Sequence, residues 1–490
     1  MGKSYLHIFL FLFLAAESGA QQKYWIYFKD KTPAESLSAT DYYDLPLSKS
    51  YLDSLTSLSF PVIHQSKWLN AVSIAASDHQ LPLLESLGFV EKIQPLNAGL
   101  RVRSYLQHTD AGQAHALQQL HADTLIALGL HGKGIKIGII DGGFLDADKE
   151  EPLIHLSKKL APSYYYNFIE EDIRDPFTGS RKYDDDHGTK VWRLIGGYSN
   201  DHNKHFGLAS QSTYYLARTD QGDREYRGEE DYWIAALEWM HDHGIRLVNS
   251  SLGYSNGYDN PDENYLPKDV DGRSAAITQA ANIAAKEKNM ILVVAAGNDG
   301  GNEFGVISIP ADAEGILAVG ATGFLHWKRQ GYSSVGPDAL PYVKPEIACF
   351  SGRGTSFSAP VITGLIASVI QECPAISSRE VIEIIKRSSH LYPYPNNYLG
   401  YGVPDARKIL RLINQMEIPL THMEVLATAD SIKLDVAGLN TVIFHKKDKT
   451  QVISQEIGKS RRNKLIVHRV DNAKFSTVAT PERVIEIKWL

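Results

Sequence analysis

Short, nearly continuous apolar runs recur through the middle of the chain and alternate with longer amphipathic segments. The runs are KIGIID, RLVNSSL, MILVVAAG and GILAVGAT, at residues 136–141, 246–252, 290–297 and 315–322. Runs this short are typical of strands buried on both faces, as in a parallel sheet. Helical patterns such as residues 232–240 and 274–288 separate them. The alternation predicts a three-layer α/β domain over about residues 113–413.

The pattern differs on both sides of this domain. Residues 21–112 combine two strand-like runs, KYWIYFKDK and NAVSIAA, with two short helical ones, KSYLDSLTSL and LPLLESLGF. They predict a small α+β unit. Residues 415–490 contain short alternating segments such as SIKLDV, TVIFH and RVIEIKW, separated by polar turns. They predict a small antiparallel β domain of the sandwich type.

The first 20 residues have the pattern of a signal peptide. Lys3 precedes an apolar run, and Ser18 and Ala20 supply the small residues of a cleavage site. The alternative is a buried N-terminal helix. No later run reaches the roughly 18 apolar residues that a membrane span needs, so we expect no transmembrane segment in the mature chain.

Composition and charge exclude some classes of protein. The chain has 490 residues, 43% of them hydrophobic, and a net charge of −7, which indicates a globular protein without the basic footprint of a nucleic-acid partner. The only cysteines are Cys349 and Cys373. A helix predicted between them would hold them farther apart than the roughly 7 Å a disulfide allows, so we expect two free, buried thiols.

One stretch, RGTSFSAP at residues 353–360, contains a candidate nucleophile. Ser356 stands where a loop enters a predicted helix, so a negative charge beside it would meet unpaired backbone N–H groups and the positive end of the helix dipole. Ser358 would lie within the helix. Serine is also a favoured helix cap, and this stretch alone leaves both interpretations open.

A nucleophilic serine needs a base, and the base needs a carboxylate. His187 stands before Gly188 at the start of a short predicted helix, and Asp141 directly follows a buried strand. Acyl transfer also needs a donor for the developing oxyanion, which the side chain of Asn298 could supply after another strand. Structural histidines and turn-forming Asp and Asn residues are the alternatives, since each of these patterns is common by itself.

Together, the four residues have the chain order of the subtilisin arrangement. The motifs IGIIDGG, HGT, NSSLG, AAGN, ISIPADAEGILAVGAT, KPEI and GTSFSAP follow in order between about residues 134 and 406. The chain thus resembles the subtilisin-like serine proteases. The resemblance implies a three-layer subtilisin-like fold, with Ser356 as nucleophile, His187 as general acid and base, Asp141 as its orienting carboxylate and Asn298 as oxyanion donor. It also implies a specificity pocket between two walls, formed by Ser251, Leu252 and Gly253 and by Ala295, Ala296 and Gly297.

The resemblance further implies the setting of the reaction. We expect an exported endopeptidase (secreted, periplasmic or at the cell surface) that acts on protein or peptide substrates and requires no cofactor. The N-terminal unit has the length and position of the inhibitory propeptides of the family, which predicts an intramolecular inhibitor. Lys190-Val191-Trp192 and Cys349-Phe350 depart from the usual residues of the family beside the HGT and GTSFSAP motifs.

An acidic insertion, residues 254–272, follows the first pocket wall. It could line the substrate groove and favour basic peptides, as could Asp299. Residues 269–272, DVDG, could hold a structural Ca²⁺, because paired carboxylates in a loop suit a hard cation, although a solvated loop is the simpler interpretation. No other metal site is expected.

Two rival functions stay open from the sequence. A non-catalytic binding or adhesion protein on the same scaffold would lack a member of the triad, and none is missing. A serine hydrolase acting on esters would use the same triad, and a comparison of peptide and ester rates would separate it from a peptidase.

Overall fold

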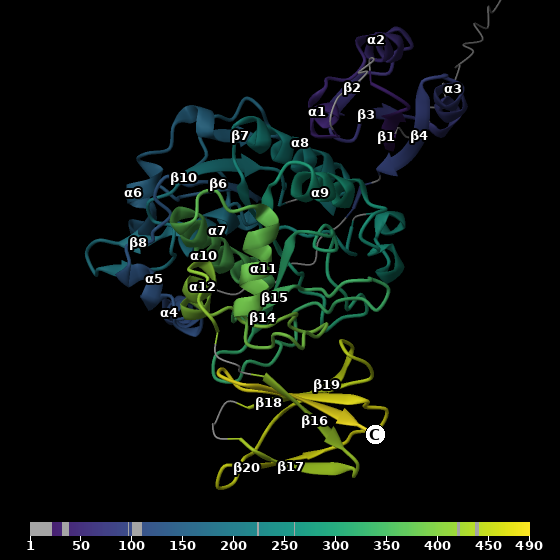
Figure 1. Cartoon of the computed structure of the whole chain (residues 1–490). Helices are drawn as coiled ribbons and strands as arrows, with labels where there is room; N and C mark the ends of the chain where they lie inside the picture. The colour runs from purple at the N-terminus through teal and green to yellow at the C-terminus, as the bar shows by residue number, and fades with distance from the viewer. Residues whose placement is uncertain are drawn as a thin grey trace, which may run out of the picture.

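The computed structural model describes residues 22–31, 39–96, 98–99, 110–222, 225–258, 260–418, 422–436 and 441–490. Residues 1–20, predicted as a signal peptide, lie outside them. Three parts follow one another along the molecule: an N-terminal unit, a central α/β domain and a C-terminal β unit (Figure 1). Within the described ranges, no helix is long and apolar enough to cross a bilayer.

A seven-stranded parallel sheet forms the centre of the molecule, in the order β15-β14-β13-β12-β6-β10-β7. Its strands are β6 (Lys136–Asp141), β7 (Tyr165–Asn167), β10 (Thr213–Arg218), β12 (Leu247–Ser250), β13 (Ile291–Ala295), β14 (Leu317–Thr322) and β15 (Ile347–Phe350). The predicted parallel sheet is confirmed, and each of the four apolar runs is one of its strands.

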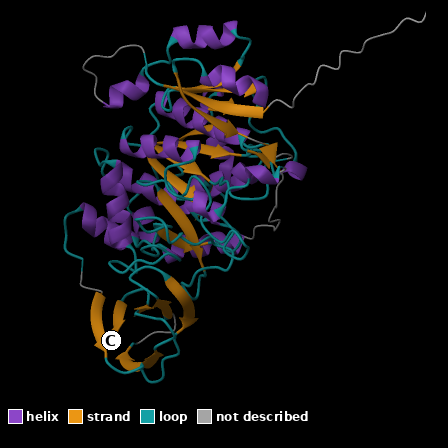
Figure 2. Cartoon of the chain, turned by 90° about the vertical axis from the view of Figure 1, so that its right-hand side faces the viewer, coloured by secondary structure: helices purple, strands orange, loops and turns teal. Residues whose placement is uncertain are grey.

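Helices cover both faces of this sheet, which gives the predicted three layers (Figure 2). One face packs against α4 (Asp110–Gln119), α5 (Asp123–Ala127), α7 (His187–Gly196), α10 (Ala359–Glu372), α11 (Ser378–Ser388) and α12 (Ala406–Ile413). The other packs against α8 (Gly228–Asp242) and α9 (Ala276–Lys286). Successive strand residues alternate between the two cores: Ile137 and Ile139 belong to the first, and Ile140 to the second. Short elements between the larger ones are α6 (Ile154–Ser157), β8 (Tyr198–Ser199) and β9 (Lys204–His205).

The N-terminal unit is an antiparallel sheet with both faces covered. Its strands β1 (Gln22–Phe28), β2 (Val62–Ser66), β3 (Ala71–Ala76) and β4 (Val90–Leu96) have the order β2-β3-β1-β4, and its helices are α1 (Ala39–Asp44), α2 (Lys49–Ser57) and α3 (Leu81–Glu85). On β1, Tyr24 and Ile26 face the unit's own core, whereas Trp25 and Tyr27 pack with residues of α8. The period-two pattern of β1 therefore joins this unit to the central domain.

The chain then leaves the N-terminal unit as an extended segment. β5 (Ala98–Gly99) pairs antiparallel with β11 (Glu225–Tyr226), which directly precedes α8. A segment of the N-terminal part thus adds a strand to the central domain just before α8, whose first turn also binds β1 through the ion pair between Lys23 and Asp231.

The C-terminal unit contains two sheets. β16 (His422–Ala427), β18 (Val442–Lys446), β19 (Val452–Ile457), β21 (Phe475–Ala479) and β22 (Val484–Trp489) form one, in the order β16-β22-β21-β18-β19, and β17 (Ser431–Asp435) pairs with β20 (Lys464–His468). The predicted antiparallel unit is confirmed except at one edge, where β16 runs parallel to β22. These strands come from opposite ends of the unit, and the long connection between them permits a parallel pair.

Both cysteines are free thiols, as predicted, but only Cys349 is buried. Cys373 lies just beyond the end of α10 and is partly exposed. The burial predicted for Cys373 is therefore wrong: the apolar run that suggested it ends before the cysteine.

Candidate active site

The site begins at the carboxyl end of β6, a strand in the interior of the sheet. Asp141 is the last residue of β6, and the chain continues from there to β7 and β10 on one side of β6 and later to β12 on the other. Open α/β sheets form a crevice at such a switch point. Asp141 is fully buried. A buried carboxylate is stable only with partners, and Asp141 has two that the structure places close by.

The first partner is His187, the first residue of α7. Its Nδ1 lies 2.6 Å from Asp141 Oδ1, which also accepts a hydrogen bond of 2.9 Å from the backbone N–H of Gly142. The other carboxylate oxygen of Asp141 is buried and has no hydrogen-bond partner among the described residues. The carboxylate is thus directed at the imidazole, and the tautomer with a proton on Nδ1 leaves Nε2 able to accept one.

Ser356 lies in a one-turn 3-10 helix, Thr355–Phe357, that precedes α10. The predicted long helix therefore starts later than the sequence suggested, at Ala359, and Ser358 stands at its N-cap. Ser356 Oγ donates a hydrogen bond of 3.1 Å to the carbonyl oxygen of Ser251. The aromatic ring of Phe357, the next residue, lies 5.4 Å from the ring of His187, measured between centroids.

Asn298 follows β13 after a turn at Gly297, whose φ of 104° favours glycine. Its Oδ1 accepts hydrogen bonds from the backbone N–H of Thr355, at 2.9 Å, and from the Thr355 hydroxyl, at 3.2 Å. The side-chain oxygen is thereby fixed toward the segment that carries Ser356. The side-chain NH₂ is the donor group that remains for a ligand in the cleft.

A cleft of about 1120 Å³ connects these residues. Its lining includes His187, Asn298 and Ser356, together with the predicted wall residues Ser251, Leu252, Gly253, Ala295 and Gly297. Asp141 and Ala296 are not in the lining, and both are fully buried behind it. The structure therefore brings the predicted residues to one edge of the sheet, from the ends of three strands (β6, β12 and β13) and from the starts of two helices.

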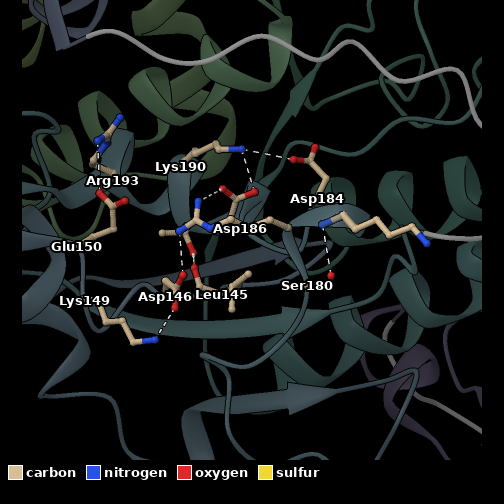
Figure 3. A network of polar contacts seen from close by, with 12 residues as sticks. Leu145, Asp146, Lys149, Glu150, Ser180, Asp184, Asp186, Lys190 and Arg193 are labelled. Atoms are coloured by element: carbon tan, nitrogen blue, oxygen red, sulfur yellow. Dashed lines mark hydrogen bonds and ion pairs between the residues drawn. The ribbon is translucent and has the colours of Figure 1, made fainter.

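Charged side chains surround the start of α7 at one end of the cleft (Figure 3). Lys190 Nζ contacts Asp186 at 2.9 Å and Asp184 at 3.4 Å, and Arg181 joins Asp186 to Asp146 at 3.1 and 2.8 Å. Hydrogen bonds from Lys149 and Arg181 lower the pKa of Asp146. The network pairs its positive and negative charges locally and ties the loop before His187 to the loop after Asp141.

An ion pair between the partly buried Arg218 and the buried Asp185 was not predicted from the sequence. Arg218, the last residue of β10, donates from Nε to the carbonyl oxygen of Gly142 at 3.0 Å and from Nη2 to Asp185 Oδ1 at 3.0 Å. It therefore links the residue after Asp141 to a residue two positions before His187. A charged residue at the end of a buried strand, TYYLAR, was the available signal.

The acidic insertion contributes to the cleft through residues 254–258. Asp269 accepts from the backbone N–H of Leu266, and Asp271 accepts from the backbone N–H groups of Arg273 and Ser274. In the described part of the chain, no three His, Cys, Asp or Glu side chains gather as metal ligands. Asp299 Oδ1 accepts from Asn302 Nδ2 at 2.7 Å, so this carboxylate holds its own turn.

Comparisons with known proteins agree with this geometry. Residues 132–402 match the model of the subtilase family, and residues 23–110 match that of the peptidase S8 propeptide domain of Bacteroidota. Subtilisin DY of Bacillus licheniformis is 24% identical over 280 residues, which cover 54% of this chain and 88% of that protein. The halolysin-like extracellular serine protease of Natrialba magadii is 26% identical over 309 residues, covering 60% of this chain and 51% of that protein.

Solved structures share the fold at low sequence identity. Fervidolysin from Fervidobacterium pennivorans, a keratinolytic enzyme related to subtilisin, superposes with a TM-score of 0.55 at 16% identity, covering 95% of this chain and 71% of that one. The epidermin leader peptide processing serine protease of Staphylococcus aureus has a TM-score of 0.55 at 16% identity, covering 81% of this chain and 100% of that one. With a family model that matches more than half of its residues, the chain belongs to the subtilase family of serine proteases and has an N-terminal propeptide domain.

Proposed function

We propose that the protein is an exported serine endopeptidase in which Asp141, His187 and Ser356 act as the catalytic triad. Ser356 Oγ attacks the carbonyl carbon of a peptide bond, and its proton passes to His187 Nε2. Asp141 orients the imidazole and stabilises the positive charge that forms on it. His187 then gives the proton to the leaving amine, and a water molecule activated in the same way releases the acyl-enzyme.

The observation that carries this proposal is the 2.6 Å contact between Asp141 Oδ1 and His187 Nδ1 in a cleft that Ser356 also lines. The buried carboxylate at hydrogen-bonding distance from Nδ1 holds the imidazole in one orientation and can stabilise the positive charge that forms when Nε2 takes a proton. The pair is therefore suited to act as a general base.

The developing oxyanion would be bound by the Asn298 side-chain NH₂ and the backbone N–H of Ser356. The hydrogen bonds from Thr355 to Asn298 Oδ1 support this role, because they fix the amide before the substrate arrives. Substrate would bind between the walls 251–253 and 295–297. None of these steps needs a cofactor, and a structural Ca²⁺ at residues 269–272 stays a prediction.

The N-terminal unit would act as an intramolecular inhibitor. In support, Glu238 of α8 accepts hydrogen bonds from the Ser66 hydroxyl, at 2.5 Å, and from the backbone N–H groups of Lys67 and Trp68. The β5–β11 pair adds a strand to the central domain, and strand addition is a common mode of peptide recognition. The pattern of residues 1–20 and the extracellular relative support export.

Labelling with a serine-directed fluorophosphonate tests the triad. We expect the full-length protein to be labelled, Ser356→Ala and His187→Ala to lose the label, and Ser358→Ala to keep it, because Ser358 is fully buried two residues away. A wild type that neither labels nor cleaves casein, even after long incubation for self-processing, would favour the non-catalytic alternative. A labelled protein that cleaves esters but no peptide would favour the ester hydrolase.

A further inference from the structure

The slot between the two pocket walls contains the side chain of Ser308. A Cβ atom added to Gly253 would lie 2.8 Å from Ser308 Cβ, and one added to Gly297 would lie 2.2 Å from Ser308 Oγ. Neither wall therefore leaves a methyl-sized gap beside Ser308. The Ser308 side chain therefore fills the space that Gly253 and Gly297 leave between the walls.

Ser308 lies at the inner end of the slot and not at its mouth. Gly253 is exposed, whereas Ser308 is only 3% exposed and still belongs to the lining of the cleft. A substrate side chain that entered between the walls would therefore meet the Ser308 hydroxymethyl group before it reached the protein interior.

The backbone holds Ser308 in this place. Its N–H donates to the carbonyl oxygen of Ala296 at 3.0 Å, so it is bonded to one wall. The next residue, Ile309, exchanges two backbone hydrogen bonds with Tyr254, at 2.8 and 2.7 Å, which joins it to the end of the other wall. Ser308 cannot withdraw without breaking contacts to both walls, so a bulky ligand would not displace it at low cost.

Acidic residues in the lining of the cleft do not override this steric limit. Asp299 and Glu303 line the cleft and could attract a basic side chain. Asp299, however, is engaged by Asn302 at 2.7 Å, and an extended lysine or arginine side chain would still meet Ser308 inside the slot. Size, and not charge, is the property that the slot selects most directly.

We infer that Ser308 restricts the substrate residue that supplies the scissile carbonyl to a small side chain, namely that of Gly, Ala or Ser. This inference rests on the proposed function, since it assumes that acylation occurs at Ser356 and that the slot receives that residue. The Ser308 hydroxyl also gives the slot a polar inner end, which a small hydroxyl-bearing or methyl side chain can contact without leaving a large void. Pockets discriminate against one excess methylene by roughly 10–200-fold, so Leu and Phe should be cleaved far more slowly.

The test is a series of peptides that differ only at this residue, with Gly, Ala, Ser, Leu or Phe, cleaved by the self-processed full-length protein. We expect kcat/KM for Ala to exceed that for Leu and Phe by at least about tenfold. Ser308→Gly should raise kcat/KM for Leu and Phe by about tenfold or more and change that for Ala by less than about threefold. The matched control is Ser210→Gly, a buried loop serine outside this cleft, which should keep the wild-type order.

Cleavage sites in digests of an unfolded protein give a second readout that needs no variant. A wild type that cuts after Leu or Phe as readily as after Ala would overturn the inference, as would a Ser308→Gly enzyme with the wild-type ratios. Fluorophosphonate labelling distinguishes a failure of the inference from a failure of the proposed function. A labelled enzyme that cleaves peptides but does not prefer small side chains contradicts only the role of Ser308. An unlabelled protein that cleaves no peptide contradicts the proposed function, and the inference with it.

Discussion

Ser356 and Ser251 exchange hydrogen bonds: Ser356 Oγ donates to the Ser251 carbonyl oxygen at 3.1 Å, and Ser251 Oγ donates to the Ser356 carbonyl oxygen at 2.9 Å. Ser251 Oγ in turn accepts from Asn249 Nδ2 at 3.0 Å, and Asn249 Oδ1 accepts from the Thr363 hydroxyl at 2.9 Å. The chain of bonds crosses from α10 through β12 to the candidate nucleophile. It fixes the distance between the nucleophile and one wall of the substrate slot.

Replacing Ser251 by alanine should therefore impair the chemical step more than binding. The change removes the donor to the Ser356 carbonyl and leaves Asn249 Nδ2 without its acceptor, so we expect kcat to fall about tenfold with KM nearly unchanged. Steady-state kinetics on an Ala-containing peptide measures both constants. The neighbouring Ser250→Ala is the control, because Ser250 Oγ bonds Trp233 on the other face of the sheet, and its kcat should stay within about twofold of the wild type.

The Asn298 side chain should stabilise the transition state of the reaction, whereas it should contribute little to the stability of the fold. Asn298→Asp keeps an oxygen for the Thr355 N–H but removes the NH₂ donor, so we expect kcat to fall about 10²–10³-fold, the loss that removing such a donor causes in a subtilisin. KM and the melting temperature should change little. An Asp variant with near wild-type kcat would mean that Asn298 does not bind the oxyanion.

The Arg218–Asp185 pair should hold Asp141 and His187 in their positions relative to each other. Arg218→Gln leaves the buried Asp185 carboxylate without its cation, so we expect the free energy of unfolding to drop by about 3–5 kcal/mol and kcat to fall with it. The double variant Arg218→Leu/Asp185→Leu should recover most of the stability but not the activity. Full recovery of both would show that the pair has no positioning role.

Glu238 should control the release of the N-terminal unit. Glu238→Ala removes the acceptor of the Ser66 hydroxyl and of two backbone N–H groups, so we expect the full-length protein to gain activity after a lag at least about tenfold shorter. A time course of peptide cleavage after purification measures the lag. Asp242→Ala removes the more exposed contact with Lys67 of the N-terminal unit, together with a 3.6 Å contact to His241 within α8, and should shorten the lag much less. Equal lags in all three proteins would contradict the role of Glu238.

His390 should make the fold sensitive to acid. Burial, with a smaller contribution from Lys408, lowers the pKa of His390 to about 3 from its usual 6.5. Below pH 6.5 the unfolded chain takes up a proton that the folded chain does not, so stability falls as the pH decreases toward 3. Each pH unit below 6.5 lowers the free energy of unfolding by about 1.4 kcal/mol. The free energy of unfolding should therefore be about 2 kcal/mol lower at pH 5 than at pH 7.

The variant His390→Gln keeps an acceptor for the Val403 N–H, which His390 Nδ1 now binds at 2.8 Å, but it does not titrate. Urea unfolding at pH 7 and at pH 5 measures how much the free energy of unfolding falls between the two pH values. This fall should be about 2 kcal/mol smaller for the variant than for the wild type. Equal losses in the two proteins would mean that His390 takes up its proton in the folded state.

The sequence predicted the central sheet well, because strands buried on both faces appear as unbroken apolar runs. Strands β7, β10 and β15 were not read from the sequence. TYYLAR, at β10, begins and ends with polar residues, although its interior is buried. The parallel β16–β22 pair was beyond prediction as well, since no local pattern specifies which distant strand is its neighbour.

For the site, residue type and chain order were sufficient to name Asp141, His187, Asn298 and Ser356 as candidates. Chain order could not reveal Ser308, although it lies within a motif used for the resemblance, because its role depends on the approach of two glycines from other strands. The roles of Arg218 and Asp185 were not predicted from the sequence for the same reason. Each looks like an ordinary charged residue until the fold buries them against each other.

The two free cysteines have a consequence for how the fold responds to reducing agents. Cys349 is enclosed in the sheet next to the Ser358 carbonyl, and burial raises the pKa of its thiol, which suppresses the reactive thiolate. Cys373 stands beyond the far end of α10. Cys349 and Cys373 are the only cysteines of the chain and both are free, so a reducing agent should leave the free energy of unfolding unchanged.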